Sequence, residues 1–292
     1  MDHTANSDRA ETISIRAALI GRGIAKSRTP AMHMEEGRAL KVAYDYRLFD
    51  TDDDAFKGQT LANILHRAES ENFAGLNVTF PYKIEVLSLL DGLSENARNV
   101  GAVNTIVLRN GKRLGHNTDL WGFAESFRRG MADASTEDVL LIGAGGAGVS
   151  VAFALLTLGV EKLRVFDVQP DRATALASAL TEKFGTGRAI VSDGSDFDDP
   201  GIDGVVNATP VGMDKFPGTP FPKRFLRPEM WVADIVYFPL ETQFLQDARE
   251  IGCRTLPGSG MAVFQAVRAF KLITGIDPDA ARMRRTFDSF GT

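Results

Sequence analysis

Cysteine is almost absent from this sequence. Cys253 is its only cysteine, so no intrachain disulfide can form. No apolar run reaches the roughly 18 residues that a membrane-spanning helix needs, and we therefore expect no membrane segment. The first twelve residues, MDHTANSDRAET, are polar and lack the apolar stretch of a secretory signal, so we expect a disordered tail there. Together these features favour the reducing cytoplasm.

A block of like charges is also missing. The 33 Lys and Arg residues are interspersed among 38 Asp and Glu, and the net charge is −5. This pattern disfavours nucleic-acid binding, although a few local donors can still hold a small anion. The four histidines, His3, His33, His66 and His116, show no metal-ligand spacing, and one cysteine cannot build a zinc cluster. The sequence therefore predicts no metal site.

What is present is an ordinary globular chain of 292 residues, 44% hydrophobic and 24% charged, long enough for two domains of moderate size. In its first part we expect a helix opened by Thr29 as N-cap and Pro30 at the first helical position, and a second helical pattern over 57–71. Asn110-Gly111 predicts the turn of a β-hairpin over 103–117. Three further strands are expected at 15–21, 43–50 and 74–80.

The second part alternates regularly between strand and helix patterns. Helices are expected from the glycine-rich turn after residue 143 to about residue 158, and over 170–184. Buried strands are expected at 138–143, 162–168, 188–192, 203–209 and 231–237. This alternation predicts a parallel sheet covered on both faces. Two helices, 261–275 and 278–287, close the chain, which we assign to a two-domain α/β fold.

A glycine-rich turn follows the strand at 138–143. Its motif Gly-x-Gly-x-x-Gly suits a tight turn, a close approach of pyrophosphate to the backbone and close helix–strand packing. Because it follows a strand and opens a helix, it predicts a dinucleotide site with the phosphates at the helix N-terminus. The alternative is a turn needed for packing alone. The residues concerned are Gly143, Ala144, Gly145, Gly146, Ala147 and Gly148.

Asp167 ends the next strand, about 20 residues beyond the glycines, where a carboxylate can accept hydrogen bonds from the adenosine ribose. It would repel a 2′-phosphate, so we expect NAD in preference to NADP. Arg172 could stack beside the adenine or reach a 2′-phosphate, which keeps NADP open. A solvated strand end for Asp167 and a surface position for Arg172 are the alternatives.

Polar clusters stand at strand ends and loops of the first part, where functional groups are usually found. They offer hydroxyls, amides, one amine and one carboxylate, a set that suits a small polyhydroxylated acid. The clusters are 27–30, 77–83, 101–105 and 116–119.

With these clusters the chain resembles the shikimate dehydrogenase family from about residue 15 to the end. The motifs that carry the resemblance are NVTFPYK, GAVNT, NTD, GAGGAG, VNATPVGM and ADIVYFPLET. Within the family it looks most similar to the NAD-dependent quinate/shikimate dehydrogenases. Thr29 stands where many biosynthetic members carry serine, and Asp167 where NADP-dependent members carry a basic motif.

The resemblance implies that Lys83 and Asp119 form the catalytic pair. An ammonium group can donate to the reacting oxygen and exchange its proton, while a carboxylate orients it. The alternatives are an exposed Lys83 at a helix start and Asp119 as the N-cap of the helix that follows.

The resemblance also implies further ligands. Ser27 and Thr29 would hold the substrate carboxylate, and the extra methyl of Thr29 would change the pocket to admit quinate's additional hydroxyl. Thr79, Asn104 and Gln265 would bind ring hydroxyls, with a strand-end turn and an exposed helix position as the alternatives for the last two. Tyr237 would border the pocket, or else be a packed aromatic. The cofactor would contact Ala208, Thr209, Met213 and Gly260.

The implied fold is an N-terminal α/β substrate domain, 1–118 plus 261–292, and a Rossmann-type, doubly wound parallel sheet over 119–260. The implied activity is reversible hydride transfer between the C3 hydroxyl of shikimate or quinate and NAD, giving 3-dehydroshikimate or 3-dehydroquinate. The alternatives are a strictly biosynthetic NADP-dependent shikimate dehydrogenase, an aminoshikimate-type enzyme and a non-catalytic NAD-binding sensor. We expect a small-molecule substrate as the only partner and a monomer or homodimer.

Overall fold

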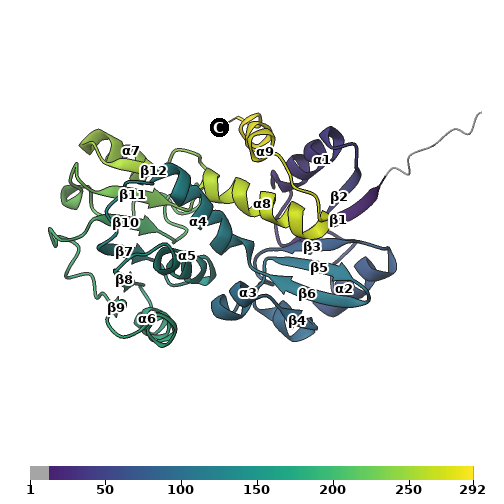
Figure 1. The fold of residues 1–292 in the computed structure, drawn as a ribbon, viewed down its shortest axis with the longest axis horizontal. Helices are drawn as coiled ribbons and strands as arrows, with labels where there is room; N and C mark the ends of the chain where they lie inside the picture. Colours follow the sequence, from purple (N-terminus) through teal and green to yellow (C-terminus); the bar gives the residue numbers. More distant parts are fainter. Residues whose placement is uncertain (1–12, 292) are drawn as a thin grey trace, which may run out of the picture.

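Two six-stranded sheets form the framework of the molecule (Figure 1). The computed structural model describes residues 13–291. The tail predicted for residues 1–12 lies outside this range. Within the described residues, no helix is long and apolar enough to cross a membrane.

The N-terminal sheet has the strand order β2-β1-β3-β5-β6-β4. β1 runs parallel to β2 and β3, whereas β5 is antiparallel to both β3 and β6. Asn110 and Gly111, with φ of 53° and 68°, form the predicted turn between β5 and β6. The strands are β1 (Ser14–Gly21), β2 (Ala43–Asp50), β3 (Gly75–Val78), β4 (Gly92–Leu93), β5 (Thr105–Arg109) and β6 (Lys112–His116).

Helix α1 begins after a short loop that follows β1, as predicted, but its cap differs from the prediction. Arg28 is the N-cap residue, without a side-chain cap hydrogen bond, and Thr29 already belongs to the helix. The expectation that Thr29 caps the helix is therefore wrong: its hydroxyl lies one position too late, and it is free for the cavity described below. The helical elements of this part are α1 (Thr29–Ala39), α2 (Leu61–Ser70), the 3-10 turn Glu85–Leu89 and α3 (Glu95–Val100).

The second sheet is parallel throughout, as the alternation predicts. Val139 and Leu141 pack into one hydrophobic cluster and Leu140 and Ile142 into another, so both faces of β7 are covered. The strand order is β12-β11-β10-β7-β8-β9. The strands are β7 (Asp138–Ile142), β8 (Lys162–Phe166), β9 (Ala189–Val191), β10 (Gly204–Asn207), β11 (Trp231–Asp234) and β12 (Arg254–Leu256).

The strand order makes a switch point between β7 and β10. β8 and β9 are added on one side of β7, whereas β10, β11 and β12 are added on its other side. The connections after β7 and β10 therefore leave to opposite sides and open a crevice at the carboxyl ends of these strands, where ligands of doubly wound sheets bind. The elements between the strands are α5 (Gly146–Thr157), α6 (Pro170–Phe184), the 3-10 turn Lys223–Phe225 and α7 (Gln243–Ile251). The strand β12 and the helix α7 are absent from the sequence prediction.

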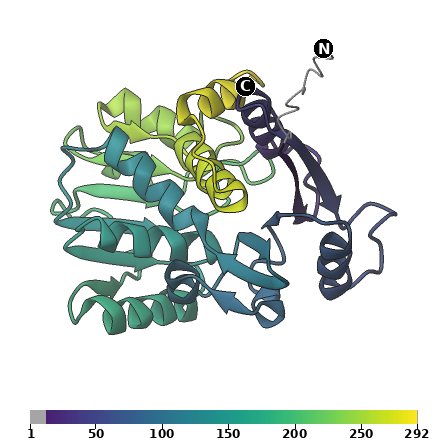
Figure 2. The same ribbon diagram turned by 45° about the vertical axis from the view of Figure 1, so that its right-hand side comes forward.

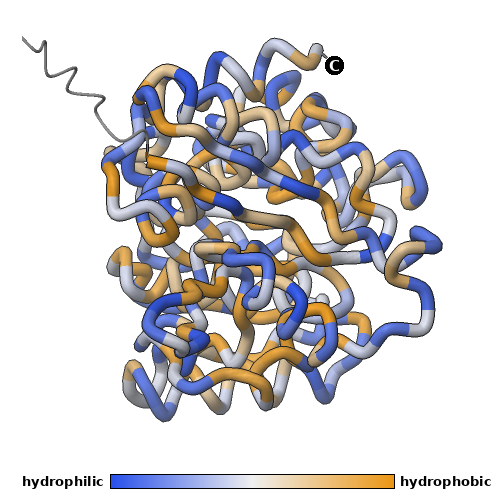
Figure 3. Tube along the Cα trace, turned by 90° about the vertical axis from the view of Figure 1, so that its right-hand side faces the viewer, coloured by the Kyte–Doolittle hydropathy of each residue, from blue (hydrophilic) through white to orange (hydrophobic). Residues whose placement is uncertain are grey.

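Two helices connect the two halves, α4 (Thr118–Gly130) and α8 (Ser259–Thr274), and α9 (Ala280–Asp288) follows α8. α8 packs along α4 and against β3 and β5, and α9 lies beside α1 (Figure 2). A Cβ on Gly122 would lie 2.8 Å from the Met261 carbonyl oxygen, so glycine permits the close approach of α4 and α8. Orange, hydrophobic stretches run through both halves of the hydropathy-coloured tube (Figure 3). The domain boundaries at 118/119 and 260/261 stay a prediction.

Candidate active site

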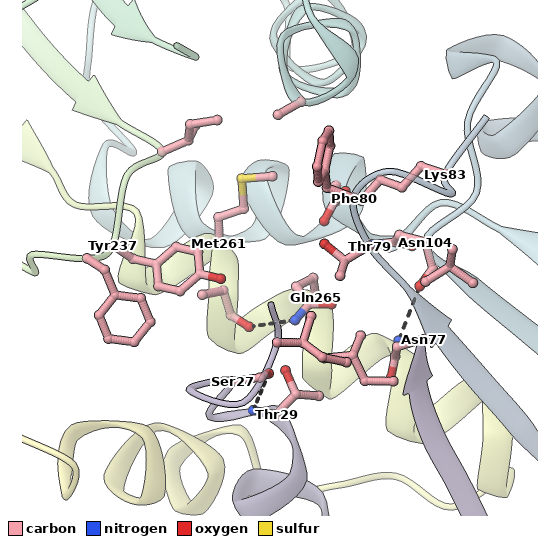
Figure 4. A pocket seen from close by; sticks show the side chains of 18 of the residues that line it. Ser27, Thr29, Asn77, Thr79, Phe80, Lys83, Asn104, Tyr237, Met261 and Gln265 are labelled. Atoms are coloured by element: carbon pink, nitrogen blue, oxygen red, sulfur yellow. Dashed lines mark hydrogen bonds and ion pairs between the residues drawn. The ribbon is translucent and has the colours of Figure 1, made fainter. Parts of the chain in front are cut away.

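A cavity of about 450 Å³ lies between the two halves (Figure 4). Its wall includes residues of β1 and β3, the loop before α1, the segment after β11 and the helix α8. The structure brings together all eight side chains assigned to catalysis or substrate binding. They are Ser27, Thr29, Thr79, Lys83, Asn104, Asp119, Tyr237 and Gln265.

Lys83 and Asp119 face each other in this wall. Lys83 lies in the turn that follows β3, and Asp119 in the first turn of α4. Lys83 Nζ lies 2.7 Å from Asp119 Oδ2, and the two side chains are 28% and 11% exposed. Asn117 caps α4, accepting from the Leu120 amide at 3.1 Å, so the alternative in which Asp119 is the cap is wrong. The pair is a mostly buried ammonium–carboxylate contact with access to the cavity.

Asn104 is held by the start of α4. Its Oδ1 accepts hydrogen bonds from the Thr118 amide at 2.7 Å and from the Thr118 hydroxyl at 3.1 Å. Its side chain is 4% exposed and lines the cavity. The side chain of Asn104 is therefore fixed in orientation before any ligand binds.

Asn77 belongs to the predicted polar cluster 77–83 and lines the cavity, but the sequence prediction assigned it no role. Its Oδ1 accepts from the Tyr46 hydroxyl at 2.7 Å, and its Nδ2 donates to Thr105 Oγ1 at 3.0 Å. These bonds connect β3 to its neighbour β5 and, across β1, to β2. A polar residue inside a buried strand, at the start of the motif NVTFPYK, is the signal that could have pointed to it.

Ser27 lies on the loop before α1, and Thr29 is the first residue of α1 (Figure 4). The Ser27 hydroxyl accepts from the Thr29 amide at 3.3 Å, and both residues line the cavity. Thr79 stands opposite the end of β1: a Cβ on Gly21 would lie 2.3 Å from Thr79 Cγ2. Glycine at position 21 therefore lets Thr79 reach its place in the wall.

Gln265 and Tyr237 close the other side of the cavity. Gln265 belongs to α8, and its Nε2 donates to the Ala262 carbonyl at 3.1 Å. Tyr237 follows β11, is 40% exposed and lines the cavity. Desolvation by the surrounding protein raises the pKa of its hydroxyl, with a smaller opposing effect from Lys83. Tyr237 thus supplies a neutral hydroxyl to the cavity wall.

The glycine-rich turn has the shape that a dinucleotide phosphate requires. Gly143 has φ of +106°, and a Cβ on Gly148 would lie 2.0 Å from the Gly143 carbonyl oxygen. By contrast, a Cβ on Gly145 or Gly146 would meet no atom within 4 Å. The first residues of α5 therefore present bare backbone amides to open space, an arrangement that binds phosphate. NAD fits this turn, with Ala144 and Ala147 at its edges.

Asp167 lies directly behind the turn. Its Oδ2 accepts from the Ala144 amide at 2.7 Å, and its Oδ1 accepts from the Gln169 amide at 2.8 Å. The carboxylate is thus fixed between the glycine-rich turn and the start of α6. Arg172 is an exposed residue of α6, three positions after Gln169. This places one anion and one cation near the end of β8.

The remaining residues assigned to the cofactor are spread along the crevice. Ala208 packs against Gly143, whose Cβ would lie 2.8 Å from the Ala208 carbonyl carbon. The Thr209 hydroxyl donates to Asn207 Oδ1 at 2.7 Å, and Met213 lines the cavity. Gly260 lies in the first turn of α8, where a Cβ would meet Ser126 Oγ of α4 at 2.1 Å. The close packing of α8 against α4 therefore accounts for a glycine at position 260. A role of Gly260 in binding the cofactor stays a prediction.

The described residues contain no group of side chains arranged as metal ligands. Over residues 13–291, no three His, Cys, Asp or Glu side chains gather as a metal site would need. The expectation that the protein works without a metal stays a prediction.

Fold and site together define a class: a two-domain α/β protein with a dinucleotide-binding turn beside a polar cavity that holds a lysine–aspartate pair. Comparison with known proteins narrows the class. Residues 19–106 match the model described as "Shikimate dehydrogenase substrate binding domain", and residues 258–286 match "Shikimate 5'-dehydrogenase C-terminal domain". The chain belongs to the shikimate dehydrogenase family.

Relatives of known name are similar over almost the whole chain. A "Quinate/shikimate dehydrogenase (NAD(+))" of Corynebacterium efficiens is 50% identical over 94% of this chain and 98% of its own. A "Shikimate dehydrogenase (NADP(+))" of Streptomyces avermitilis is 48% identical over 92% and 94%. Among solved structures, quinate dehydrogenase from Corynebacterium glutamicum in complex with NAD superposes with a TM-score of 0.92. It is 47% identical and covers 95% of this chain and 100% of that chain.

Proposed function

We propose that the protein is an NAD-dependent dehydrogenase that oxidises the C3 hydroxyl of shikimate or quinate, or reduces the corresponding ketone. The observation that carries this proposal is the position of the Lys83–Asp119 pair. It lies in the wall of a cavity whose lining also includes Ala147 of the glycine-rich turn and Met213. A substrate in the cavity would therefore lie next to a nucleotide bound at the turn.

Oxidation of a secondary alcohol to a ketone requires two transfers from the alcohol. A proton leaves the oxygen and a hydride leaves the carbon; when bound, NAD supplies the acceptor for the hydride. Lys83 Nζ is the group placed to hydrogen-bond the reacting oxygen and to exchange its proton, and Asp119 orients the amine and takes part in the proton transfer. In the direction of ketone reduction the same ammonium donates the proton to the carbonyl oxygen.

The other polar groups of the wall suit a polyhydroxylated carboxylic acid. The hydroxyls of Ser27 and Thr29 would hold the carboxylate. Ring hydroxyls would bind Thr79, Asn104 and Gln265, and Tyr237 would border the ring. Because Thr118 already holds the Asn104 side chain in place, Asn104 would not have to reorient when the substrate binds. It would therefore favour a substrate whose ring hydroxyl stands at the matching position.

Preference for NAD follows from Asp167. Its carboxylate lies at the end of β8, beside the turn that would hold the pyrophosphate, where a ribose would approach. A ribose hydroxyl can donate to this carboxylate, whereas a 2′-phosphate would be repelled. Gly143, Gly145, Gly146 and Gly148 form the turn itself, with Ala208, Thr209 and Met213 toward the nicotinamide.

The experiment that tests the proposal is a matrix of initial rates followed by nicotinamide absorbance. Shikimate and quinate are each assayed with NAD and with NADP. We expect turnover of at least one acid, faster with NAD. A protein that binds NAD but reduces it with neither acid would be a sensor, and the proposal would fail. Rates confined to NADP and shikimate would instead identify the biosynthetic alternative.

An amino analogue of shikimate, added to the same matrix, addresses the aminoshikimate-type alternative. A rate with the analogue that exceeds both acids would favour that enzyme. The monomeric or homodimeric state and the cytoplasmic location stay predictions of the sequence.

A further inference from the structure

The side chain of Arg28 points away from the cavity that its two neighbours line. Ser27 and Thr29 are both part of the cavity wall. Arg28, between them, is 6% exposed, and no Asp or Glu of residues 13–291 forms an ion pair with it. A cation buried in this way needs other partners to offset its lost hydration.

Those partners come from the C-terminal end of the chain. Arg28 Nη1 donates to the Phe287 carbonyl at 2.9 Å, and Nη2 donates to the Gly291 carbonyl at 2.7 Å. The planar, forked guanidinium is suited to hold two acceptors at once. The loop after β1 is thus bonded to the last turn of α9 and to the residues beyond it, which lie about 260 positions later in the chain.

Aromatic rings complete the surroundings of the guanidinium. Its carbon lies 4.7 Å from the ring centroids of both Phe238 and Phe287, and 5.7 Å from that of Phe290. These distances are those of cation–π contacts. Phe238 belongs to the segment after β11 and lines the cavity, so Arg28 also connects the loop to the other half of the molecule.

The same C-terminal helix supports Tyr237. The ring of Phe287, 1% exposed, lies 6.3 Å from the ring of Tyr237, which in turn lies 5.0 Å from the ring of Phe238. One cluster of side chains therefore stands behind two parts of the cavity wall: the hydroxyl pair Ser27 and Thr29, and the ring of Tyr237.

We propose that Arg28 is a positioning residue for the substrate subsite, and that the C-terminal segment 287–291 is part of the active-site structure through it. The guanidinium fixes the backbone between Ser27 and Thr29, and with it the separation of the two hydroxyls. The inference rests on the proposed function, in which these hydroxyls hold the substrate carboxylate.

The test compares two variants of Arg28 with a matched arginine. Arg28→Met keeps an unbranched chain among the rings but removes both hydrogen bonds, and Arg28→Lys keeps the charge without the fork. Arg282→Met is the control, because Arg282 also anchors α9, through buried Glu36 of α1 at 2.7 Å, but does not contact the loop. Loss of either anchor would loosen α9; only loss of Arg28 would also release the backbone that carries the Ser27 and Thr29 hydroxyls.

We expect Arg28→Met to raise the KM for the acid substrate by about tenfold, as loss of a charge-assisted contact does, and Arg28→Lys to raise it by less. The kcat and the affinity for NAD should stay within about twofold of the wild type in both. Arg282→Met should lower the melting temperature and leave the KM unchanged. An unchanged KM in Arg28→Met, or an equal rise in Arg282→Met, would overturn the proposal.

A second measurement does not depend on turnover. Amide hydrogen exchange over residues 24–29 should be faster in Arg28→Met than in the wild type and in Arg282→Met. If the wild type oxidises neither acid, the proposed function fails and exchange alone decides the positioning role. Equal exchange in the two arginine variants would reject it.

Discussion

Lys83 Nζ and Asp119 Oδ2 lie 2.7 Å apart although 36 residues separate them in the chain. The turn after β3 carries the amine and the first turn of α4 carries the carboxylate, so the pair exists only once the N-terminal sheet and α4 are packed together. Lys83→Met removes the proton-exchanging amine and should lower kcat by about a hundred- to ten-thousandfold. Affinity for NAD, measured by fluorescence titration, should be retained because the nucleotide turn belongs to the other half.

The matched control is Lys112→Met, an exposed lysine of the hairpin strand β6. It removes one positive charge from the same half of the protein without touching the cavity, and should leave kcat and KM unchanged. Wild-type turnover in Lys83→Met would show that the lysine takes no part in the chemistry.

The glycine-rich turn predicts opposite outcomes for one substitution at two positions. Gly148→Ala puts a methyl group 2.0 Å from the Gly143 carbonyl oxygen, so α5 and β7 must move apart and the melting temperature should fall. Gly145→Ala meets open space, and its φ of −75° is allowed for alanine, so the fold should keep its stability. Its methyl group would occupy the space that the pyrophosphate needs, and NAD binding should be lost.

Thermal denaturation and NAD titration of both variants check this prediction. A stable Gly148→Ala variant would show that the close contact is relieved without cost. Tight NAD binding by Gly145→Ala would place the phosphates elsewhere.

Asp167 offers a test of cofactor choice. Asp167→Asn keeps one oxygen that can accept from the Ala144 amide at the present 2.7 Å contact, and removes the charge that would repel a 2′-phosphate. We expect the ratio of kcat/KM for NAD to that for NADP to fall by about tenfold or more, mainly through the loss of a charged acceptor for the ribose. Asp171→Asn, an exposed carboxylate of α6, is the control and should leave the ratio unchanged. Equal effects of the two variants would count against the ribose assignment.

His33 makes the stability depend on pH in a direction that can be worked out. It is fully buried in α1, with Nδ1 3.1 Å from the Tyr44 hydroxyl, and burial lowers its pKa from 6.5 to about 3. Between these values the unfolded chain binds a proton that the folded protein does not. The contribution of neutral His33 is therefore complete above about pH 6.5 and is lost as the pH falls toward 3.

His33→Gln removes this titration, so its free energy of unfolding should fall less steeply between about pH 7 and about pH 5 than that of the wild type. Asp234, whose pKa burial raises to about 6, has the opposite slope in part of this range but is common to both proteins. Urea denaturation at several pH values gives the difference. His66→Gln, at a side chain 82% exposed, should reproduce the wild-type slope; the same slope in His33→Gln would contradict the prediction.

Much of the fold follows from local pattern. β2 spans Ala43–Asp50 and α6 spans Pro170–Phe184, the ranges that the strand and helix patterns predict. The short strand β12, Arg254–Leu256, has too few residues to establish a period, and it forms because β11 offers a free parallel edge. Such an element depends on the sheet already being there.

The site likewise has a part that the sequence predicts and a part that depends on tertiary packing. Motifs and resemblance indicated which side chains to bring together, and the cavity contains the eight assigned to catalysis and substrate. The cap of α1 was misassigned because a Thr-Pro pair does not fix which residue is the last with non-helical backbone. Asn77 and Arg28 lie in the predicted polar clusters but were assigned no role, because their partners, Tyr46 and the Phe287 carbonyl, become neighbours only through tertiary packing.

Thr29 provides the remaining test, of substrate preference. Its side chain lines the cavity beside the Ser27 hydroxyl, and because Arg28 rather than Thr29 is the cap residue, its hydroxyl serves no helix bond. Thr29→Ser keeps the hydroxyl and removes one methyl group. A methyl group is roughly as large as the single hydroxyl by which quinate's ring substituents exceed those of shikimate, so its loss should change how well the pocket distinguishes the two acids. Such a change alters discrimination by about tenfold.

We expect the ratio of kcat/KM for quinate to that for shikimate to fall in Thr29→Ser, with shikimate turnover preserved, in competition assays with both acids present. Thr29→Ala is the matched comparison, because it removes the hydroxyl as well and should raise the KM for both acids. An unchanged quinate-to-shikimate ratio in Thr29→Ser would place the discrimination elsewhere in the wall.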